Sequence, residues 1–313
     1  MYDPSKPYKR KILRLNKSTW QTPYVSIRAG TYPVITKKFK GPEVHHSDGI
    51  GTKGVYHWRK RSFKNAVIDA FAMNANDIAM AGAIPYGLQD HIVVPEVGER
   101  AILEIIRALT ALCRKYKVAI TGGETSHHDN VEALDIGIVM ASFLPKPRTN
   151  RFKRGDVLIG LESSGLHSNG FTKVRGLFGK NEWRADFIRP TSIYLDTIRG
   201  FLKKYEIHGM MHITGGAFTK LKDLLKDADA IISHPSKLQP HAIFRELFER
   251  GVSDKQMYTT FNCGIGFVLS VPEREAAEII MKTRNAAVIG KIVSGNGLVR
   301  IQSAFTGKTV IIL

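Results

Sequence analysis

The sequence predicts an α+β fold divided into two domains, and three observations support this prediction. The chain has 313 residues, which is long enough for two domains of ordinary size. Short runs of β-branched and apolar residues alternate with longer segments of helical periodicity, which indicates mixed sheets and helices. Near the middle, Pro145–Thr149 contains two prolines and two charged residues, which is typical of a linker.

The first domain is expected at residues 31–146, after a polar, basic segment (1–30) whose prolines predict a mobile start. Strands are predicted where apolar and β-branched residues form short runs: 32–36, 44–46, 54–58, 88–94, 118–121 and 131–143. A helix is predicted at 62–81, because Val67, Phe71 and Ile78 recur at helical spacing. A second helix, 99–116, places Ile102, Ile105, Ile106, Leu109 and Leu112 on one side.

The second domain is expected at residues 147–313 and opens with a Val/Leu/Ile strand at 156–161. Helices are predicted from apolar periodicity at 168–177, 192–205, 217–225, 240–249 and 273–284. Further strands are predicted at 230–233, 264–271, 288–293 and 298–301.

Composition excludes several classes of protein. With 43% hydrophobic and 24% charged residues, the chain has the make-up of a globular protein, and no apolar run is long enough to span a bilayer. The N-terminal twenty residues lack the apolar core of a secretion signal. The two cysteines, Cys113 and Cys263, have no zinc-binding spacing and indicate a reducing compartment. We therefore expect a cytoplasmic protein that does not contact a membrane.

The chain is strongly basic: 46 Lys and Arg against 28 Asp and Glu give a net charge of +18. Such an excess favours anionic partners, either nucleic acid, a membrane surface or phosphorylated metabolites. The basic residues occur in short runs spread along the chain, so we interpret the charge as a general surface property rather than a nucleic-acid site.

A glycine-rich segment, Ser47–Lys53 (SDGIGTK), is the first candidate site. Its glycines allow backbone N–H groups to approach an anion, Asp48 is a possible Mg²⁺ ligand, and Lys53 supplies positive charge to phosphates. The alternative is a glycine turn with a capping aspartate.

Polar residues in the helix at 62–81 form the second candidate. Asp69 and Asn76 are seven positions apart and share a face, and Asp77 lies one position around the helix. Asn and Asp are poor helix formers, so a row of metal or ribose contacts is one interpretation and a solvated face is the other.

Further carboxylates lie at the ends of predicted strands. Asp90 ends one apolar segment, and Gly122-Gly123-Glu124 follows another. Gathering several carboxylates beside a glycine-rich turn is costly unless Mg²⁺ neutralises them, so these residues support a shared Mg²⁺ and phosphate site.

The second half contains three polar turns. In Ser163–Gly170, Ser168 or Asn169 is expected to cap a helix, and His167 is either an acid, base or electrostatic group or simply part of the capping turn. Thr214-Gly215-Gly216 repeats a glycine turn before a helix, and Asn262 precedes a glycine-containing strand.

Seven motifs in this order resemble the family of aminoimidazole ribonucleotide (AIR) synthetase, also called phosphoribosylformylglycinamidine cyclo-ligase. The motifs are Ser47–Lys53, Ala72–Asp77, Gly122–Thr125, Ser163–Gly170, Pro190–Tyr194, His212–Gly216 and Thr260–Gly266. Each motif is weak alone, but their order is specific. The resemblance runs from about residue 30 to the C-terminus. It departs from the family at Ser26–Gly30 and in a shorter loop, Ser126–Asn130.

The resemblance implies a two-domain ATP-binding fold. Its N-terminal mixed sheet would form a barrel across a homodimer, and its C-terminal domain would be α/β. It implies ATP-dependent ring closure of formylglycinamidine ribonucleotide, with ATP and Mg²⁺ as cofactors and a phosphorylated ribonucleotide as substrate. The alternative is another ATP-dependent kinase or ligase of the same superfamily. A basic nucleic-acid-binding protein with the same fold is a third possibility, which the joint retention of Asp48, Lys53, Asp77, Glu124 and His167 disfavours.

Site residues follow from the motifs and the resemblance together. The implied catalytic residues are His167 and Asp77, and the implied metal ligands are Asp48, Asp77 and Glu124. The implied ATP and phosphate contacts are Gly49, Gly51, Thr52, Lys53, Asp69, Asp90, Gly122 and Gly123. The implied substrate contacts are Ser168, Asn169, Thr191, Thr214, Gly215, Gly216 and Asn262.

Overall fold

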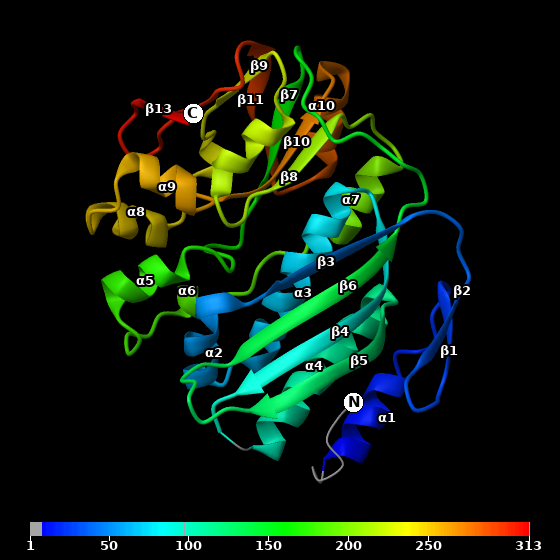
Figure 1. Cartoon of the computed structure of the whole chain (residues 1–313). Helices are drawn as coiled ribbons and strands as arrows, with labels where there is room; N and C mark the ends of the chain where they lie inside the picture. The colour runs from blue at the N-terminus through cyan, green and yellow to red at the C-terminus, as the bar shows by residue number, and fades with distance from the viewer. Residues whose placement is uncertain (1–7, 97, 313) are drawn as a thin grey trace. The chain divides into compact units, whose positions relative to one another are not determined.

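A computed structural model describes residues 8–96 and 98–312, which divide into two units (Figure 1). The first unit contains the chain up to Pro147 together with Trp183–Ile193, and the second contains Arg148–Glu182 and the chain from Tyr194 onward. The first change of unit falls within the predicted linker. Segment 183–193 lies in the first unit although the sequence placed it in the second domain, because side chains of the first unit hold its backbone.

The first unit is built on a four-stranded sheet in the order β3 (Glu43–Gly49), β6 (Asp135–Phe143), β4 (Ile84–Val94) and β5 (Ala119–His127). Strands β4 and β5 are parallel and are joined by helix α4 (Glu99–Tyr116), as a parallel pair requires. Helix α3 (Phe63–Met80) packs against α4, β3 and β6. Side chains alternate along β6 between buried and more exposed, so the helices cover one face of this sheet.

Helix α4 confirms the predicted helix at 99–116, and Ile102, Ile105, Ile106 and Leu109 are buried as expected. The strand predicted at 54–58 is wrong, because this segment is helix α2 (Gly54–Lys60), which follows the short 3₁₀ turn η1 (Gly51–Lys53). Its aromatic and β-branched residues suggested a strand. They are buried instead as helical side chains, which shows tertiary packing overriding local propensity.

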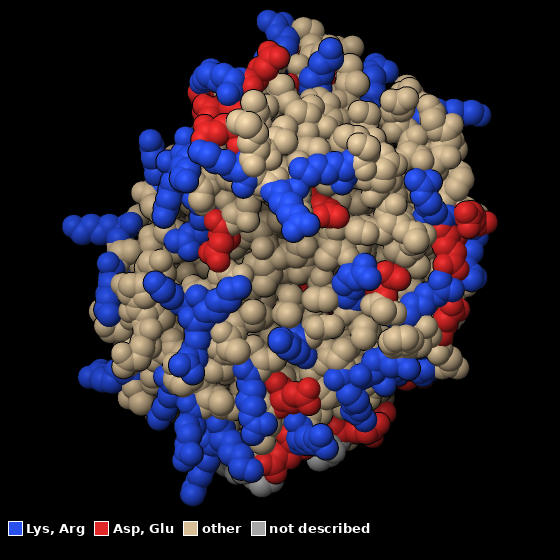
Figure 2. All heavy atoms as spheres, turned by 180° about the vertical axis from the view of Figure 1, so that it is seen from behind, with Lys and Arg blue, Asp and Glu red and all other residues tan. Residues whose placement is uncertain are grey.

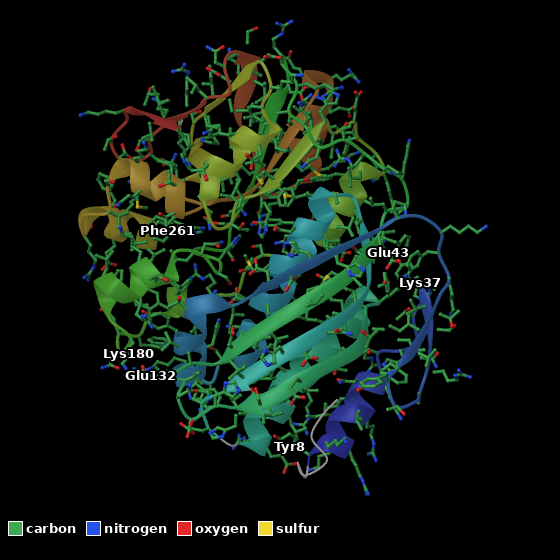
Figure 3. All side chains as sticks on the ribbon, in the orientation of Figure 1. Tyr8, Lys37, Glu43, Glu132, Lys180 and Phe261 are labelled. Atoms are coloured by element: carbon green, nitrogen blue, oxygen red, sulfur yellow. The ribbon has the colours of Figure 1, made fainter. Side chains whose placement is uncertain are left out.

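The N-terminal segment that was predicted to be mobile contains regular structure in the residues described. Helix α1 (Lys9–Lys17) packs against α4 and β5 through Ile12, which is fully buried. A hairpin of β1 (Val25–Arg28) and β2 (Val34–Lys37) follows. Lys37 of β2 pairs with Glu43 at the start of β3 (Figure 3), and this contact holds the pKa of Glu43 down at about 2. Residues 1–7 of the predicted mobile segment lie outside the described part of the chain.

The second unit contains a seven-stranded sheet. Its order is β13 (Thr309–Ile312), β12 (Val299–Gln302), β9 (Ala228–Ile232), β11 (Ala286–Ser294), β7 (Val157–Glu162), β10 (Ile265–Val271) and β8 (Gly209–His212). Every residue of β10 is buried. Strands β8 and β13 were not predicted, because each has only four residues and no polar alternation that marks a strand.

Four helices of the second unit lie close to predicted ranges, the predicted helix at 217–225 is a 3₁₀ segment, and the helix at 254–260 and the 3₁₀ turn at 236–238 were not predicted. The helices are α5 (Phe171–Phe178), α7 (Leu195–Leu202), α8 (Ala242–Glu249), α9 (Asp254–Thr260) and α10 (Glu273–Lys282), with 3₁₀ segments η2 (Ala217–Leu224) and η3 (Ser236–Leu238). The short helix α6 (Ala185–Ile188) belongs to the first unit.

None of the helices in the described ranges has both the length and the apolar character needed to cross a membrane. Lys and Arg side chains are spread over the face shown in Figure 2, with Asp and Glu among them. On this face the basic excess is therefore distributed, as the sequence indicated.

Candidate functional site

The glycine-rich turn after β3 is fixed against strand β6. Ile50 donates its backbone N–H to the carbonyl of Ile136 (3.2 Å), and a Cβ on Gly54 would lie 1.8 Å from the carbonyl oxygen of Leu134. Gly51 instead has φ +54° and open space where a Cβ would stand. Within SDGIGTK, Gly51 is therefore the glycine that an incoming ligand can approach.

Lys53, predicted to meet phosphates, is fully buried and turned away from the exposed turn. Its Nζ lies 2.8 Å from Oδ2 of Asp69, which is also fully buried, and donates to the carbonyl of Arg189 (2.6 Å). Burial lowers the pKa of Lys53, and the charge of Asp69 opposes that effect. Burial alone would raise the pKa of Asp69, but the charge of Lys53 and a hydrogen bond from His57 hold it well below its usual value.

Asp69 is the centre of a fully connected buried network. Its Oδ2 also accepts from Nε2 of His57 (2.8 Å), and its Oδ1 accepts from the backbone N–H (2.7 Å) and the hydroxyl (2.6 Å) of Thr191. Thr191 and Asp69 were predicted to contact substrate and nucleotide. In the structure they bind each other, so both help to hold segment 183–193 on the first unit.

The polar face of α3 holds the backbone of that segment at three points. Asn65 donates to the carbonyl of Ile188 (2.9 Å), Asp69 accepts from Thr191, and Asn76 donates to the carbonyl of Ser192 (2.9 Å). Asp69 and Asn76 do share a face, as predicted. That face binds the backbone of segment 183–193. This role differs from both interpretations of the sequence, which were a row of metal or ribose contacts and a solvated face.

A second polar cluster lies where α3 meets β3. Nδ1 of His46 is 3.0 Å from Oδ1 of Asn74, its Nε2 is 3.2 Å from Oδ2 of Asp77, and Asn74 donates to the carbonyl of Asp48 (3.0 Å). Both ring nitrogens of His46 face oxygen atoms. The hydrogen bond to Asp77 therefore raises the pKa of His46, with the charges of Asp77 and Asp48 adding to the effect. Asp77 thus contacts the ring of His46 directly, and the charge of Asp48 also acts on that ring.

Glu124 does not join Asp48 and Asp77. Asp48, Ile138, Asp90 and Gly123 are consecutive partners across the sheet, and the next row contains His91 and Glu124. Because neighbouring residues of a strand point to opposite faces, Asp48 and Glu124 lie on opposite sides of the sheet. The predicted convergence of Asp48, Asp77 and Glu124 on one ion is therefore not met within this chain. Among residues 8–96 and 98–312, no group of three or more His, Cys, Asp or Glu residues is placed to hold a metal.

Asp90 and the Gly122-Gly123 pair are packed together. Asp90 is 4% exposed, and a Cβ on Gly123 would lie 2.5 Å from its carboxylate. Gly122 belongs to the opposite face, where a Cβ would meet the side chain of Gln89 at ordinary contact distance. Gly123 is thus a glycine because the buried Asp90 carboxylate occupies the space beside it.

In the second unit, Asn262 organises the turn that contains His167. Its Oδ1 accepts from the hydroxyl of Ser163 (2.8 Å) and the N–H of Gly264 (2.9 Å), and its Nδ2 donates to the carbonyl of Gly165 (2.8 Å). Asn262 is 2% exposed, so this predicted substrate contact is a structural bridge between two motifs. The neighbouring Phe261 (labelled in Figure 3) lies against Gly170, where a Cβ would be 2.2 Å from its ring.

His167 is buried inside this turn, with a backbone φ of +58°. Its Nε2 accepts from the N–H of Ser164 (3.2 Å), and its ring lies 6.3 Å from His212 and 6.2 Å from Tyr194. A Cβ on Gly266 would lie 2.7 Å from the His167 ring. This geometry favours the capping-turn interpretation that the sequence left open over an acid or base exposed to a substrate.

The remaining predicted substrate contacts of this unit lie around an exposed glycine turn. Thr214 is buried, Gly215 and Gly216 are exposed, and Nζ of Lys220 donates to the Thr214 hydroxyl (2.9 Å). A Cβ on Gly215 would lie 3.6 Å from Oδ1 of Asn169, so the Ser168-Asn169 turn reaches the same place.

Among the residues of these sites that were not predicted as site residues are His46, His57 and Lys220. His46 directly precedes the SDGIGTK motif. This position could have indicated a site residue, because a histidine next to a glycine-rich acidic turn has charged neighbours. His57 and Lys220 carried no local signal, since their partners come from other elements.

Comparison with protein families shows two matches that together span most of the chain. The model described as "AIR synthase related protein, N-terminal domain" matches residues 38–143, and "AIR synthase related protein, C-terminal domain" matches residues 153–302. The matches fall on either side of the predicted linker.

Curated relatives bear one name. The "phosphoribosylformylglycinamidine cyclo-ligase" of Saccharolobus solfataricus is 33% identical over 301 residues, covering 93% of this chain and 91% of the relative. The protein of that name from Clostridium perfringens is 34% identical over 255 residues, covering 76% of each chain. A third, from Methanococcus vannielii, is 32% identical and covers 85% of this chain and 81% of the relative.

Solved structures show the same fold at low identity. The hydrogenase maturation protein HypE in complex with ATP superposes with a TM-score of 0.72, at 15% identity, covering 99% of this chain and 95% of that one. The protein AaThiL complexed with AMPPCP and TMP gives a TM-score of 0.61 at 17% identity, covering 98% of this chain and 97% of that one. At these identities the similarity establishes the fold alone.

Proposed function

Because this chain belongs to the family of AIR synthase related proteins, we propose that it is an ATP-dependent cyclo-ligase of purine biosynthesis. The proposed reaction converts formylglycinamidine ribonucleotide and ATP to aminoimidazole ribonucleotide, ADP and phosphate. The observation that carries this proposal is 33% identity to a cyclo-ligase over 93% of this chain and 91% of the relative. Both units therefore have counterparts in the relative.

The chemistry of this reaction needs little from the protein beyond positioning and charge. ATP phosphorylates the formyl oxygen of the substrate and ADP leaves. An amidine nitrogen then attacks the formyl carbon, and phosphate leaves as the imidazole ring closes. Transfer of a phosphoryl group depends mainly on alignment and on neutralisation of the phosphate oxygens. Exposed glycine turns and a few fixed charges, such as those of both units, are suited to this task.

We assign the nucleotide to the first unit, at the turn that carries Gly51. Asp48 and Asp77 lie on the same side of the sheet beside His46, and each is half-buried. Two carboxylates fit Mg²⁺, which usually takes one or two of them together with substrate phosphates and water. When bound there, Mg²⁺ would supply the charge that offsets the phosphate oxygens. His46 lies 3.2 Å from Asp77, so the two residues would have to separate or share the carboxylate oxygens if Asp77 held an ion.

The direct test is to incubate the purified protein with MgATP and formylglycinamidine ribonucleotide and to look for the ring-closed product. We expect product with the wild type and a loss of most turnover with Asp48→Asn at unchanged thermal stability. Absence of product from wild-type protein that still binds ATP would favour another reaction of the superfamily. Full activity of Asp48→Asn would remove Asp48 from the metal site.

We also propose that the chain forms a homodimer through the open face of the four-stranded sheet. No helix of the described residues covers this face in Figure 1, and Val139 is 44% exposed at its centre, with Gln89 and His91 exposed on the adjacent strand. The resemblance to the family implies a homodimer, and this is the face of the sheet that the described helices leave uncovered. We expect Val139→Lys to convert a dimer to a monomer in light scattering, and a wild-type monomer would overturn the proposal.

A further inference from the structure

The exposed turn Thr214-Gly215-Gly216 gathers hydrogen-bond donors from two separate motifs. The backbone N–H groups of Gly215 and Gly216 have no acceptor within the described residues, and both glycines are exposed. Successive backbone N–H groups in a turn can form a concave nest for an anionic oxygen. A glycine turn alone does not establish a binding site, so side chains that could contact the same anion are required.

The side-chain amide of Asn169 provides a second, independent observation. Asn169 is 8% exposed, and its Nδ2 has no hydrogen-bond partner in the part of the chain that the structure describes. A buried amide donor without an acceptor destabilises the folded state, so its retention requires an explanation. The amide lies against Gly215, because a Cβ there would be 3.6 Å from Oδ1 of Asn169.

Lys220 adds a positive charge to the same place. Its side chain runs along Gly216, where a Cβ would lie within 4.0 Å of Lys220 Cγ and Cε, and its Nζ reaches the Thr214 hydroxyl (2.9 Å). An ammonium group has three donors, and one of them is used here.

We propose that Asn169, Gly215, Gly216 and Lys220 form a binding site for a phosphate monoester, with Lys220 as the residue that supplies its charge recognition. The two glycine N–H groups, the unpartnered Nδ2 of Asn169 and the ammonium group of Lys220 are all hydrogen-bond donors, and an oxyanion is a ligand that can accept from each of them. The site separates the predicted substrate contacts into two classes. Asn262 and Thr191 maintain structure, whereas Asn169 and the two glycines face a ligand.

Two sources of phosphate fit this chemistry: the phosphate of the ribonucleotide substrate and the terminal phosphate of ATP. The role in the reaction rests on the proposed function, but binding of phosphate does not. The primary experiment is therefore a calorimetric or NMR titration of the full chain with inorganic phosphate and with ribose 5-phosphate. We expect saturable binding, weakened about tenfold (about 1.4 kcal/mol) by Lys220→Met, because the variant loses a charge-assisted hydrogen bond to the anion.

Two variants make this test specific. Lys222→Met removes a half-buried lysine from the same helical segment and should leave phosphate affinity unchanged. Gly215→Ala should fold normally, since its Cβ meets Asn169 only at 3.6 Å, yet its methyl group would stand in the anion site and abolish binding. Absence of phosphate binding by the wild type, or equal affinities of wild type and Lys220→Met, would overturn the proposal.

Steady-state kinetics then assign the source of the phosphate. A rise in KM for the ribonucleotide in Lys220→Met at constant KM for ATP assigns the site to the substrate, and the reverse pattern assigns it to the nucleotide. Unchanged KM values for both would show that the site plays no part in the reaction. If the chain lacks cyclo-ligase activity altogether, the titration still decides whether the phosphate site exists.

Discussion

Lys53 and Asp69 form an ion pair in which both side chains are fully buried, with 2.8 Å between Nζ and Oδ2. Burying two charges is costly unless further hydrogen bonds satisfy them. Here the Arg189 carbonyl, His57 and Thr191 supply those bonds. The lysine of the SDGIGTK motif is therefore an anchor for segment 183–193, and the consequences of removing each partner can be stated.

Replacement of Lys53 by methionine should destabilise the protein by about 3–5 kcal/mol, because it leaves the Asp69 carboxylate buried without its countercharge. Lys64→Met on the exposed side of α3 is the matched control and should change the free energy of unfolding by less than about 0.5 kcal/mol. Urea unfolding measures both values. A loss below about 1 kcal/mol for Lys53→Met would show that the pair is not buried as described.

Thr191→Val should lower the free energy of unfolding by about 1.5–3 kcal/mol, because it removes a hydroxyl donor to a buried carboxylate while keeping the shape of the side chain. The exposed Thr259, whose hydroxyl donates only within its own helix, gives the control Thr259→Val with a much smaller effect. In a double-mutant cycle with Asp69→Asn, Thr191→Val should show a coupling energy of about 0.5–3 kcal/mol. Additive effects would contradict direct contact.

Stability should depend on pH through His46. Because the folded pKa of His46 is raised, mainly by its hydrogen bond to Asp77, the contribution of this contact is complete below the unfolded value of 6.5. It is lost as the pH rises through the higher folded pKa. His46→Gln should remove this decline above pH 6.5, measured as the free energy of unfolding against pH. If the free energy of unfolding fell equally steeply with pH in the wild type and in His46→Gln, the contact between His46 and Asp77 would be excluded as the source of the decline.

Gly54→Ala should destabilise the first unit by about 3 kcal/mol, because its Cβ would lie 1.8 Å from the Leu134 carbonyl oxygen and the backbone would have to move. Gly176→Ala is the opposite case. Gly176 is exposed in α5 with nothing within 4 Å of its Cβ, so alanine should stabilise that helix by about 0.5–1 kcal/mol. Thermal unfolding of both variants should shift in opposite directions, and a shared direction would contradict this account.

Helices with a clear apolar stripe could be predicted from the sequence, as 99–116 shows, because the period of the stripe and the period of the helix coincide. The segment 54–58 could not, since its aromatic and β-branched residues favour a strand locally and are buried as a helix only through contacts with distant residues. The four-residue strands β8 and β13 were missed because neither sequence, Gly-Met-Met-His or Thr-Val-Ile-Ile, alternates between polar and apolar residues, although β13 does alternate between exposed and buried side chains.

The sequence by itself determined which residues matter: SDGIGTK, the polar positions of α3, and the turns at Ser163–Gly170 and His212–Gly216 all have distinct structural roles. Only the tertiary structure decided what each side chain does. Asp69 and Lys53 neutralise each other, Asp48 and Glu124 lie on opposite faces of a sheet, and Asn262 closes a turn. The reason is physical: a motif specifies which donors, acceptors and charges are present, whereas burial and strand register specify which of them meet.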